Sequence, residues 1–245
     1  MLPLFQREPC LRASPMMIHQ EEETMSIEAE TIEHYARRAK EYELVYYQKP
    51  ERQDEIGAFR DLLTQTFSGK RVLEIACGTG FWTQALSHCA QSVTAVDIND
   101  EMLRIARAKP LGQANVTFMK LDVYELPDSL GGFDAALIAF WWSHIPKQRL
   151  RKFLMDLHRS FSVSCEVLVM DNRYVEGNST PLSRTDEDGN TYQTRKLLDG
   201  SSHELIKNFP TETELLQSLH GIATNIKFEY LQHYWTMRYT AVCSK

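Results

Sequence analysis

Two glycines and one acidic residue have the spacing of a nucleoside-binding turn. Residues 72–80 read V-L-E-I-A-C-G-T-G, and Asp97 ends a second apolar run. Without a Cβ at Gly78 and Gly80, the backbone can approach a nucleotide-like ligand closely. A carboxylate one βα unit later can accept hydrogen bonds from both hydroxyls of a ribose. These residues therefore predict a site for a ligand that contains a nucleoside.

The third glycine of the dinucleotide-binding fingerprint is missing. Thr83 stands at its position, directly after Phe81 and Trp82. A pyrophosphate needs the close approach which that glycine allows, so an NAD-dependent oxidoreductase is the weakest interpretation. What remains resembles motif I of the class I S-adenosylmethionine (SAM) methyltransferases, E-x-A-C-G-T-G.

The elements that must position these residues alternate between strand and helix. A parallel, doubly wound sheet is expected where apolar runs alternate with helical patterns. The expected strands are 71–76, 92–96, 116–121, 133–140 and 166–170, and the expected helices between them are 82–89, 101–108 and 147–161. The fold class is therefore a three-layer, Rossmann-like α/β sheet.

The ends of the chain add a helical cover and a hairpin. A helix over 27–47 carries tyrosines on one face, and a second helix is expected at 56–67. After Asp171 the chain is polar and rich in turns, and strands at 191–197 and 203–209 flank Asp199-Gly200. A helix at 212–219 and strands at 225–231 and 234–242 would complete a seven-stranded methyltransferase sheet. The segment 172–210 is expected to form a lid over the site, within a single domain spanning 25–245.

Ligands of open α/β sheets bind beyond the carboxyl ends of the strands, so each strand exit contributes cofactor contacts. The first exit offers its backbone to the methionine part of SAM, the second a carboxylate for the ribose and apolar groups for the adenine, and the third a carboxylate for the adenine amine. The expected cofactor contacts are Glu74, Ala76, Gly78 and Gly80; Asp97, Ile98 and Met102; Asp122 and Val123; Ala139; and Tyr42 from the helical cover. Individually each has a plainer explanation, such as Asp97 as a helix N-cap.

The resemblance extends from about Tyr35 to the C-terminus and is closer to a group of bacterial small-molecule O-methyltransferases, including a phosphonate O-methyltransferase. The segments that carry it are 35–42 (Y-A-R-R-A-K-E-Y), 76–83 (A-C-G-T-G-F-W-T), 139–146 (A-F-W-W-S-H-I-P), 195–200 (R-K-L-L-D-G) and 206–207 (I-K). The chain departs from that group at Cys77 and in its leading segment. The resemblance implies an acidic acceptor but does not identify it.

Four side chains are candidates for acting on the acceptor. His144 follows the fourth strand and could be a general base or a hydrogen-bond donor; the alternative is a cap on the next helix. Lys207 and Arg195, on the two arms of the hairpin, could clamp an anion or could be solvated surface charges. Tyr46, like Tyr42, could contact ligand from the helical cover or could be core packing. Of Trp141 and Trp142, only one can face the pocket.

Composition restricts the other possibilities. A formal charge of −6 and a pI near 5.8 argue against a nucleic-acid partner. Five cysteines without a close pair fit a reducing cytoplasm and suggest no metal site. No apolar run is long enough for a membrane span, so no membrane partner is expected. Residues 1–24 are expected to be a disordered extension, with Met25 as a possible true start; the oligomeric state stays open.

The sequence thus predicts an enzyme that transfers the SAM methyl group to a small molecule, with S-adenosylhomocysteine (SAH) as the product. An oxygen of an acidic metabolite is the favoured acceptor. Two alternatives remain: methylation of a nitrogen or a phenol in a specialised metabolite, and a SAM-binding sensor without catalysis. His144, Lys207 and Arg195 are useful in a reaction pocket and dispensable in a sensor.

Overall fold

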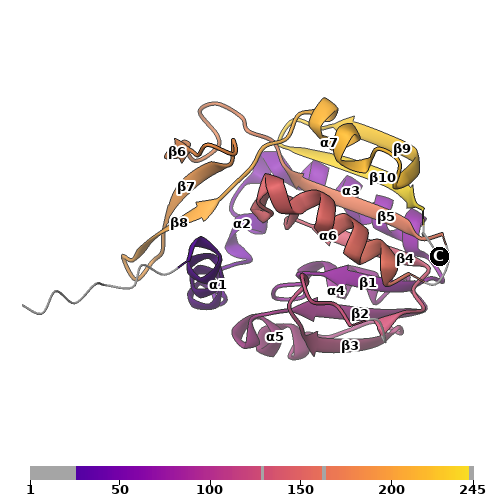
Figure 1. Ribbon diagram of the computed structural model, residues 1–245. Coiled ribbons are helices and arrows are strands. Elements are labelled where there is room, and N and C mark those ends of the chain that lie inside the picture. The colour runs from indigo at the N-terminus through magenta and orange to yellow at the C-terminus, as the bar shows by residue number, and fades with distance from the viewer. Residues whose placement is uncertain (1–25, 128–129, 162–163, 243–245) are drawn as a thin grey trace, which may run out of the picture.

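The computed structural model describes residues 26–127, 130–161 and 164–242 (Figure 1). The extension expected at 1–24 lies outside these residues. A seven-stranded sheet forms the centre, with the strand order β3-β2-β1-β4-β5-β10-β9. Its strands are β1 (Arg71–Ile75), β2 (Ser92–Asp97), β3 (Asn115–Lys120), β4 (Ala135–Ala139), β5 (Glu166–Asn172), β9 (Ala223–Tyr230) and β10 (Tyr234–Ala241). The expected seven-stranded Rossmann-like sheet is confirmed.

The sheet is parallel from β3 to β5, and its last two strands are antiparallel. Strand β10 pairs with β5 and therefore separates it from β9, its own hairpin partner. Because the five parallel strands end at the same edge, their exits gather the residues of the predicted cofactor site at one place.

Alternating side chains along the strands divide the core into two layers. On one face, Leu73 and Ile75 of β1 pack in a cluster that includes α6 (Lys147–Arg159) and α7 (Glu212–Leu219). On the other face, Val72 packs with residues of α3 (Gln53–Phe67), α4 (Phe81–Leu86) and α5 (Asp100–Arg107). This alternation is the period-2 pattern of a strand buried on both sides.

The helical cover is broken into two pieces where the sequence predicted one helix over 27–47. Helix α1 (Ile27–Arg38) ends in a series of turns, and α2 (Leu44–Tyr47) follows. The bend lets Glu43 bond both Thr79, in the glycine-bearing turn, and Lys109, after α5. Helical periodicity alone does not reveal such a break, because Tyr35, Tyr42 and Tyr46 are spaced in the sequence as they would be on one face of a continuous helix.

A second, three-stranded sheet stands beside α1 at the carboxyl end of the main sheet (Figure 1). It consists of β6 (Arg184–Thr185), β7 (Thr191–Lys196) and β8 (Ser202–Ile206). The expected hairpin around Asp199-Gly200 is present as β7 and β8, whereas β6 was not predicted. The backbone N–H of Glu204 donates to the Glu30 carboxylate, which ties this sheet to α1.

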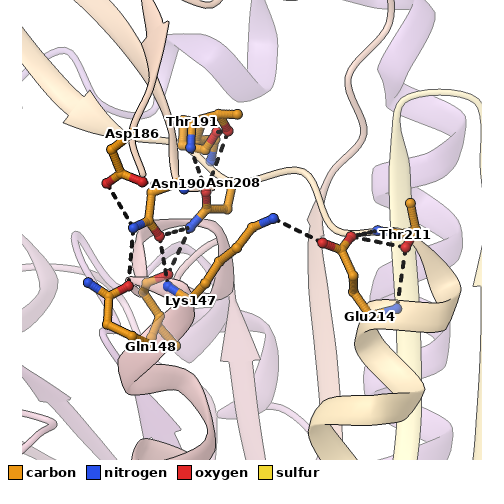
Figure 2. Close-up of polar contacts among 10 residues, drawn as sticks. Lys147, Gln148, Asp186, Asn190, Thr191, Asn208, Thr211 and Glu214 are labelled. Atoms are coloured by element: carbon orange, nitrogen blue, oxygen red, sulfur yellow. Dashed lines mark hydrogen bonds and ion pairs between the residues drawn. The ribbon is translucent and has the colours of Figure 1, made fainter. Parts of the chain in front are cut away.

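Two buried asparagines fasten the base of the three-stranded sheet to α6 (Figure 2). The Asn190 side-chain oxygen accepts the first backbone N–H of α6, from Lys147, at 2.7 Å. Asn208 donates to that same oxygen and to the Ile145 carbonyl, and it accepts the backbone N–H of Thr191. Asn190 thus caps α6 from a distant part of the chain, since Pro146, at the N-cap position, provides no side-chain cap.

Within the described ranges, no helix combines the length and the apolar character needed to cross a membrane.

Candidate active site

A cavity of about 210 Å³ lies at the exits of the parallel strands, beneath α1. Nine of the eleven expected cofactor residues line it, and they come from four strand exits and the helical cover. These are Tyr42, Ala76, Gly78, Asp97, Ile98, Met102, Asp122, Val123 and Ala139. Fold and cavity together define a nucleoside-binding α/β protein.

Asp97 is the central polar group of this first cavity. It is buried, and its carboxylate accepts the backbone N–H groups of Gly78 and Asn99, each at 2.8 Å. Burial raises the pKa of Asp97, while these two donors oppose the shift. Each carboxylate oxygen has a second lone pair, so Asp97 can hold the glycine-bearing turn and still accept from a ribose.

Glu74 and Gly80 lie outside the cavity wall. Gly80 has φ +74°, and a Cβ there would lie 2.9 Å from the Cβ of Ala106, so Gly80 allows α4 and α5 to pack closely. The Glu74 carboxyl group is buried and accepts the Thr83 hydroxyl at 2.6 Å, and burial raises its pKa to about 8. Both residues support the turn from behind rather than facing the cavity.

The cavity wall contains two strained backbone positions. Ala76 and Phe140 follow the paired strands β1 and β4 and have φ of 50° and 61°, in the region that favours glycine. Such strain persists only where the surroundings enforce it, and it concentrates at functional sites.

A second cavity, of about 150 Å³, adjoins the first and has the opposite character. Tyr35, Tyr42 and Phe140 line both. The second cavity has no carboxylate among its lining residues, but it has five cationic side chains: Arg38, Lys49, Arg52, Arg195 and Lys207. The electrostatic potential of such a pocket favours an anion.

Tyr35 and His144 form a polar contact beside the boundary between the cavities. The Tyr35 hydroxyl lies 2.8 Å from Nε2 of His144, which lines the first cavity and not the second. Burial, followed by the charge of Lys207, lowers the pKa of His144 well below its usual value, so its ring is neutral. His144 meets the second cavity through Tyr35, which lines both cavities.

Lys207 belongs to a buried polar cluster. Its ammonium group donates to the Ser143 hydroxyl at 2.6 Å and lies 3.4 Å from the fully buried carboxylate of Asp171. Asp171 also accepts the backbone N–H and the hydroxyl of Ser143. The charge of Lys207 is therefore partly balanced within the protein, although the side chain lines the second cavity.

Among the described residues, the hydrogen-bond partners of Arg195 are neutral. Its guanidinium donates to the Thr180 hydroxyl at 2.7 Å and to the Gln193 side-chain oxygen at 2.8 Å. Burial lowers its pKa, and the charges of Arg38 and Arg52 act in the same direction. Arg195 is thus a cation whose charge is available to a ligand.

Tyr46 and Trp141 line a cavity, whereas Trp142 lies in the core. Tyr46 lines the second cavity and stacks on Phe81, with ring centroids 4.0 Å apart. Trp141 lines the first cavity, whereas Trp142 is buried against Trp235, which confirms that only one of the pair faces the pocket.

Sequence reasoning missed much of the second cavity. Tyr35 was noted only as part of a tyrosine face, and Arg38, Lys49 and Arg52 were not singled out. In the sequence, Arg38 is a basic residue on the tyrosine-bearing helix, and Lys49 and Arg52 are basic residues beside Pro50. Lysines and arginines that lie on the surface look the same in a sequence, so the pattern does not distinguish a cavity residue from an exposed one. No group of three or more His, Cys, Asp or Glu side chains in the described ranges is arranged to hold a metal ion.

Known proteins similar to this chain include nucleoside-binding methyltransferases, in agreement with the ligand class that the first cavity suggests. Residues 72–162 match the family model of a methyltransferase domain. The solved SAH complex of DhpI is 27% identical, covers 88% of this chain and 96% of its own, and superimposes with a TM-score of 0.70. A DhpI complex with SAM and HEP gives 26% identity, 88% and 99% coverage and a TM-score of 0.72.

A curated relative matches a shorter stretch. The demethylmenaquinone methyltransferase of Staphylococcus aureus strain MRSA252 is 36% identical over 81 residues, which are 32% of this chain and 34% of that protein. The match thus spans about a third of the relative's length.

These similarities support a class I SAM-dependent methyltransferase whose cofactor is SAM. The residues of the first cavity fit this cofactor. Gly78 takes φ +56° at the cavity wall, Asp97 offers a buried acceptor, and the remaining wall is largely apolar.

Proposed function

We propose that this protein transfers the methyl group of SAM to an oxygen of a small acidic acceptor. The observation that carries the proposal is the second cavity, where five cations and no carboxylate face a space that adjoins the cofactor cavity. Solved complexes of DhpI, a similar chain, contain SAM or SAH, and one contains HEP as well.

SAM supplies a methyl group on a sulfonium, and an acceptor oxygen that attacks its carbon releases SAH as the C–S bond breaks. An ionised acid already carries the lone pair that attacks, so no proton has to leave during the transfer. The protein's task is then to hold the acid in line and to exclude water. A low pKa of His144 is compatible with this chemistry, because no general base is required.

Arg195 is the main candidate for holding the acid. Its planar guanidinium suits bidentate contact with an acid group, and its present partners are the neutral Thr180 and Gln193. Tyr35 can donate from the cavity boundary, and burial keeps it protonated by raising its pKa. Lys207 adds positive charge behind Ser143.

The test is SAH release from SAM with a panel of small phosphonates and carboxylates beside phenols and heteroaromatic amines. We expect turnover of acids only, and Arg195→Gln should raise KM for an acid at least tenfold. The matched control is Arg60→Gln, an exposed arginine outside both cavities. Equal turnover of neutral phenols, or an unchanged KM in Arg195→Gln, would contradict the proposal; SAM binding without any turnover would favour a sensor.

A further inference from the structure

One part of the second cavity contains a cation that the proposed transfer does not use. Arg52 is 8% exposed, and its Nη2 donates to the Oδ1 of Asn178. Its Nε is buried without a hydrogen-bond partner among the described residues. The Lys49 ammonium group donates to the backbone carbonyl and to the side-chain oxygen of the same Asn178, each at 3.4 Å. All three residues line the cavity.

Neither Arg52 nor Lys49 has a carboxylate oxygen within 4.0 Å in the described part of the chain. Of the five that line the cavity, only Lys207 has a carboxylate oxygen within 4.0 Å. The charge of exposed Glu51 acts on both cations, but Glu51 accepts from the Asn178 amide at 3.4 Å and does not line the cavity. A buried guanidinium without a counterion in direct contact is costly, so an anion that enters the cavity here lowers an existing penalty.

The charges also repel one another. Burial, and then the charge of Arg52, lowers the pKa of Lys49, and Arg195 acts in the same direction. Arg195 lines the same cavity as Tyr35 and Arg52 and interacts electrostatically with both. A single acid group bound at Arg195 and Tyr35 would therefore leave Arg52 and Lys49 without an anion.

We infer that the acceptor carries a second acid group, which binds at Arg52, Lys49 and Asn178 while the first is methylated near Tyr35. This inference rests on the proposed function, since it assumes that an acid is the methyl acceptor. A cavity of about 150 Å³ is comparable to one that admits benzene, so the two acid groups must be joined by a short linker. The substrate class is thus a compact diacid.

The test compares ligands of matched size that differ only in the second charge. Binding of phosphonoacetate and phosphonoacetamide to the SAH complex is measured by calorimetry, with succinate and succinamate as a second pair. We expect the diacid to bind at least tenfold more tightly than the amide to the wild-type protein. In Arg52→Gln and in Lys49→Met the ratio should fall to about threefold or less, with SAH affinity unchanged.

Two variants keep the test valid if one of them does not fold. Arg52 is buried, whereas Lys49 is only half-buried and its variant should fold. Arg60→Gln is the matched control and should keep the full ratio. Equal affinities within each pair for the wild-type protein would overturn the inference, and so would a ratio that persists in both variants.

Turnover separates this inference from the proposed function. If monoacids and diacids are methylated with equal kcat/KM, the inference of a second acid group is wrong, while the proposed methylation of an acid stands. If phenols are methylated and acids are not, the proposed function is wrong, and with it the assignment of a diacid acceptor.

Discussion

The Tyr35 hydroxyl lies 2.8 Å from Nε2 of His144 and joins α1 to the loop after β4. Tyr35 comes from the helix that covers the first cavity, and His144 from the 3-10 helix η3 (Trp142–His144). Because Tyr35 lines both cavities and His144 lines the first, this contact lies where the two cavities meet.

Removing either partner of this contact should slow methyl transfer. We expect Tyr35→Phe and His144→Ala each to lower kcat about tenfold, which corresponds to ~1.4 kcal/mol of transition-state stabilisation. The double variant should be no slower than either single one, because both lose the same interaction. Additive losses would mean that His144 acts on its own. Tyr47→Phe, at an exposed tyrosine, is the control for the helical cover.

Asp97→Ala should weaken SAM binding more than tenfold, or at least ~1.4 kcal/mol. The variant removes the acceptor for the ribose and also releases the Gly78 and Asn99 N–H groups. Calorimetry with SAH measures the effect. Asp100→Ala changes an exposed carboxylate paired with Lys120 and should leave the affinity unchanged. An unchanged affinity in Asp97→Ala would remove the ribose assignment.

Glu74→Gln should stabilise the protein, and increasingly so at higher pH. The folded-state pKa of Glu74 is about 8 and its ordinary value is 4.5, so between these values unfolding allows the carboxyl group to ionise. Stability of the wild-type protein is therefore lost as the pH rises through this window, and glutamine removes that loss. We expect a gain on the order of 1–3 kcal/mol at pH 8 and little gain near pH 5. Urea unfolding at both pH values measures the change in the free energy of unfolding, and Glu101→Gln, at an exposed glutamate, is the control. A gain in stability that does not depend on pH would contradict this explanation.

Lys207→Met should destabilise the fold by about 3–5 kcal/mol, because it leaves the buried charge of Asp171 without its cation. Adding Asp171→Asn should recover part of that loss, since the uncompensated charge is then gone. Thermal unfolding of the single and double variants measures both effects, and Lys227→Met serves as an exposed control. A double variant less stable than Lys207→Met would show that hydrogen bonds to the Asp171 carboxylate outweigh its charge.

The fold and the cofactor side were predictable because their signals are local in sequence. Each strand exit presents its residues within a few positions of an apolar run, as at Asp97-Ile98 and Asp122-Val123, and the sheet topology brings the exits together. The strand at 133–140 was predicted too long: β4 stops at Ala139, and Phe140 takes a left-handed backbone conformation. A sequence pattern does not reveal such a conformation in a phenylalanine.

The second cavity was less predictable from the sequence because its residues meet only through tertiary structure. Arg52 and Asn178 are 126 positions apart in the sequence, and the tertiary fold brings them to the wall of one cavity. Lys207 and Arg195 were predicted from their places on the two arms of the hairpin, but the pairing of Lys207 with Asp171 was not expected. Burial and partner identity, which decide what a cation does, depend on contacts that are not local in sequence.

All five cations of the second cavity come from segments outside the seven-stranded sheet: the helical cover, the connection after α2, and the β7–β8 hairpin with the residue that follows it. The strand exits that line the first cavity and the segments that supply the cations of the second are thus largely separate. If the acceptor binds in the second cavity as proposed, exchanging the hairpin and the connection around Pro50 for segments with other side chains changes which molecule is methylated and leaves the strand exits intact. In this architecture new substrate specificity can arise by replacing surface segments, without redesign of the core.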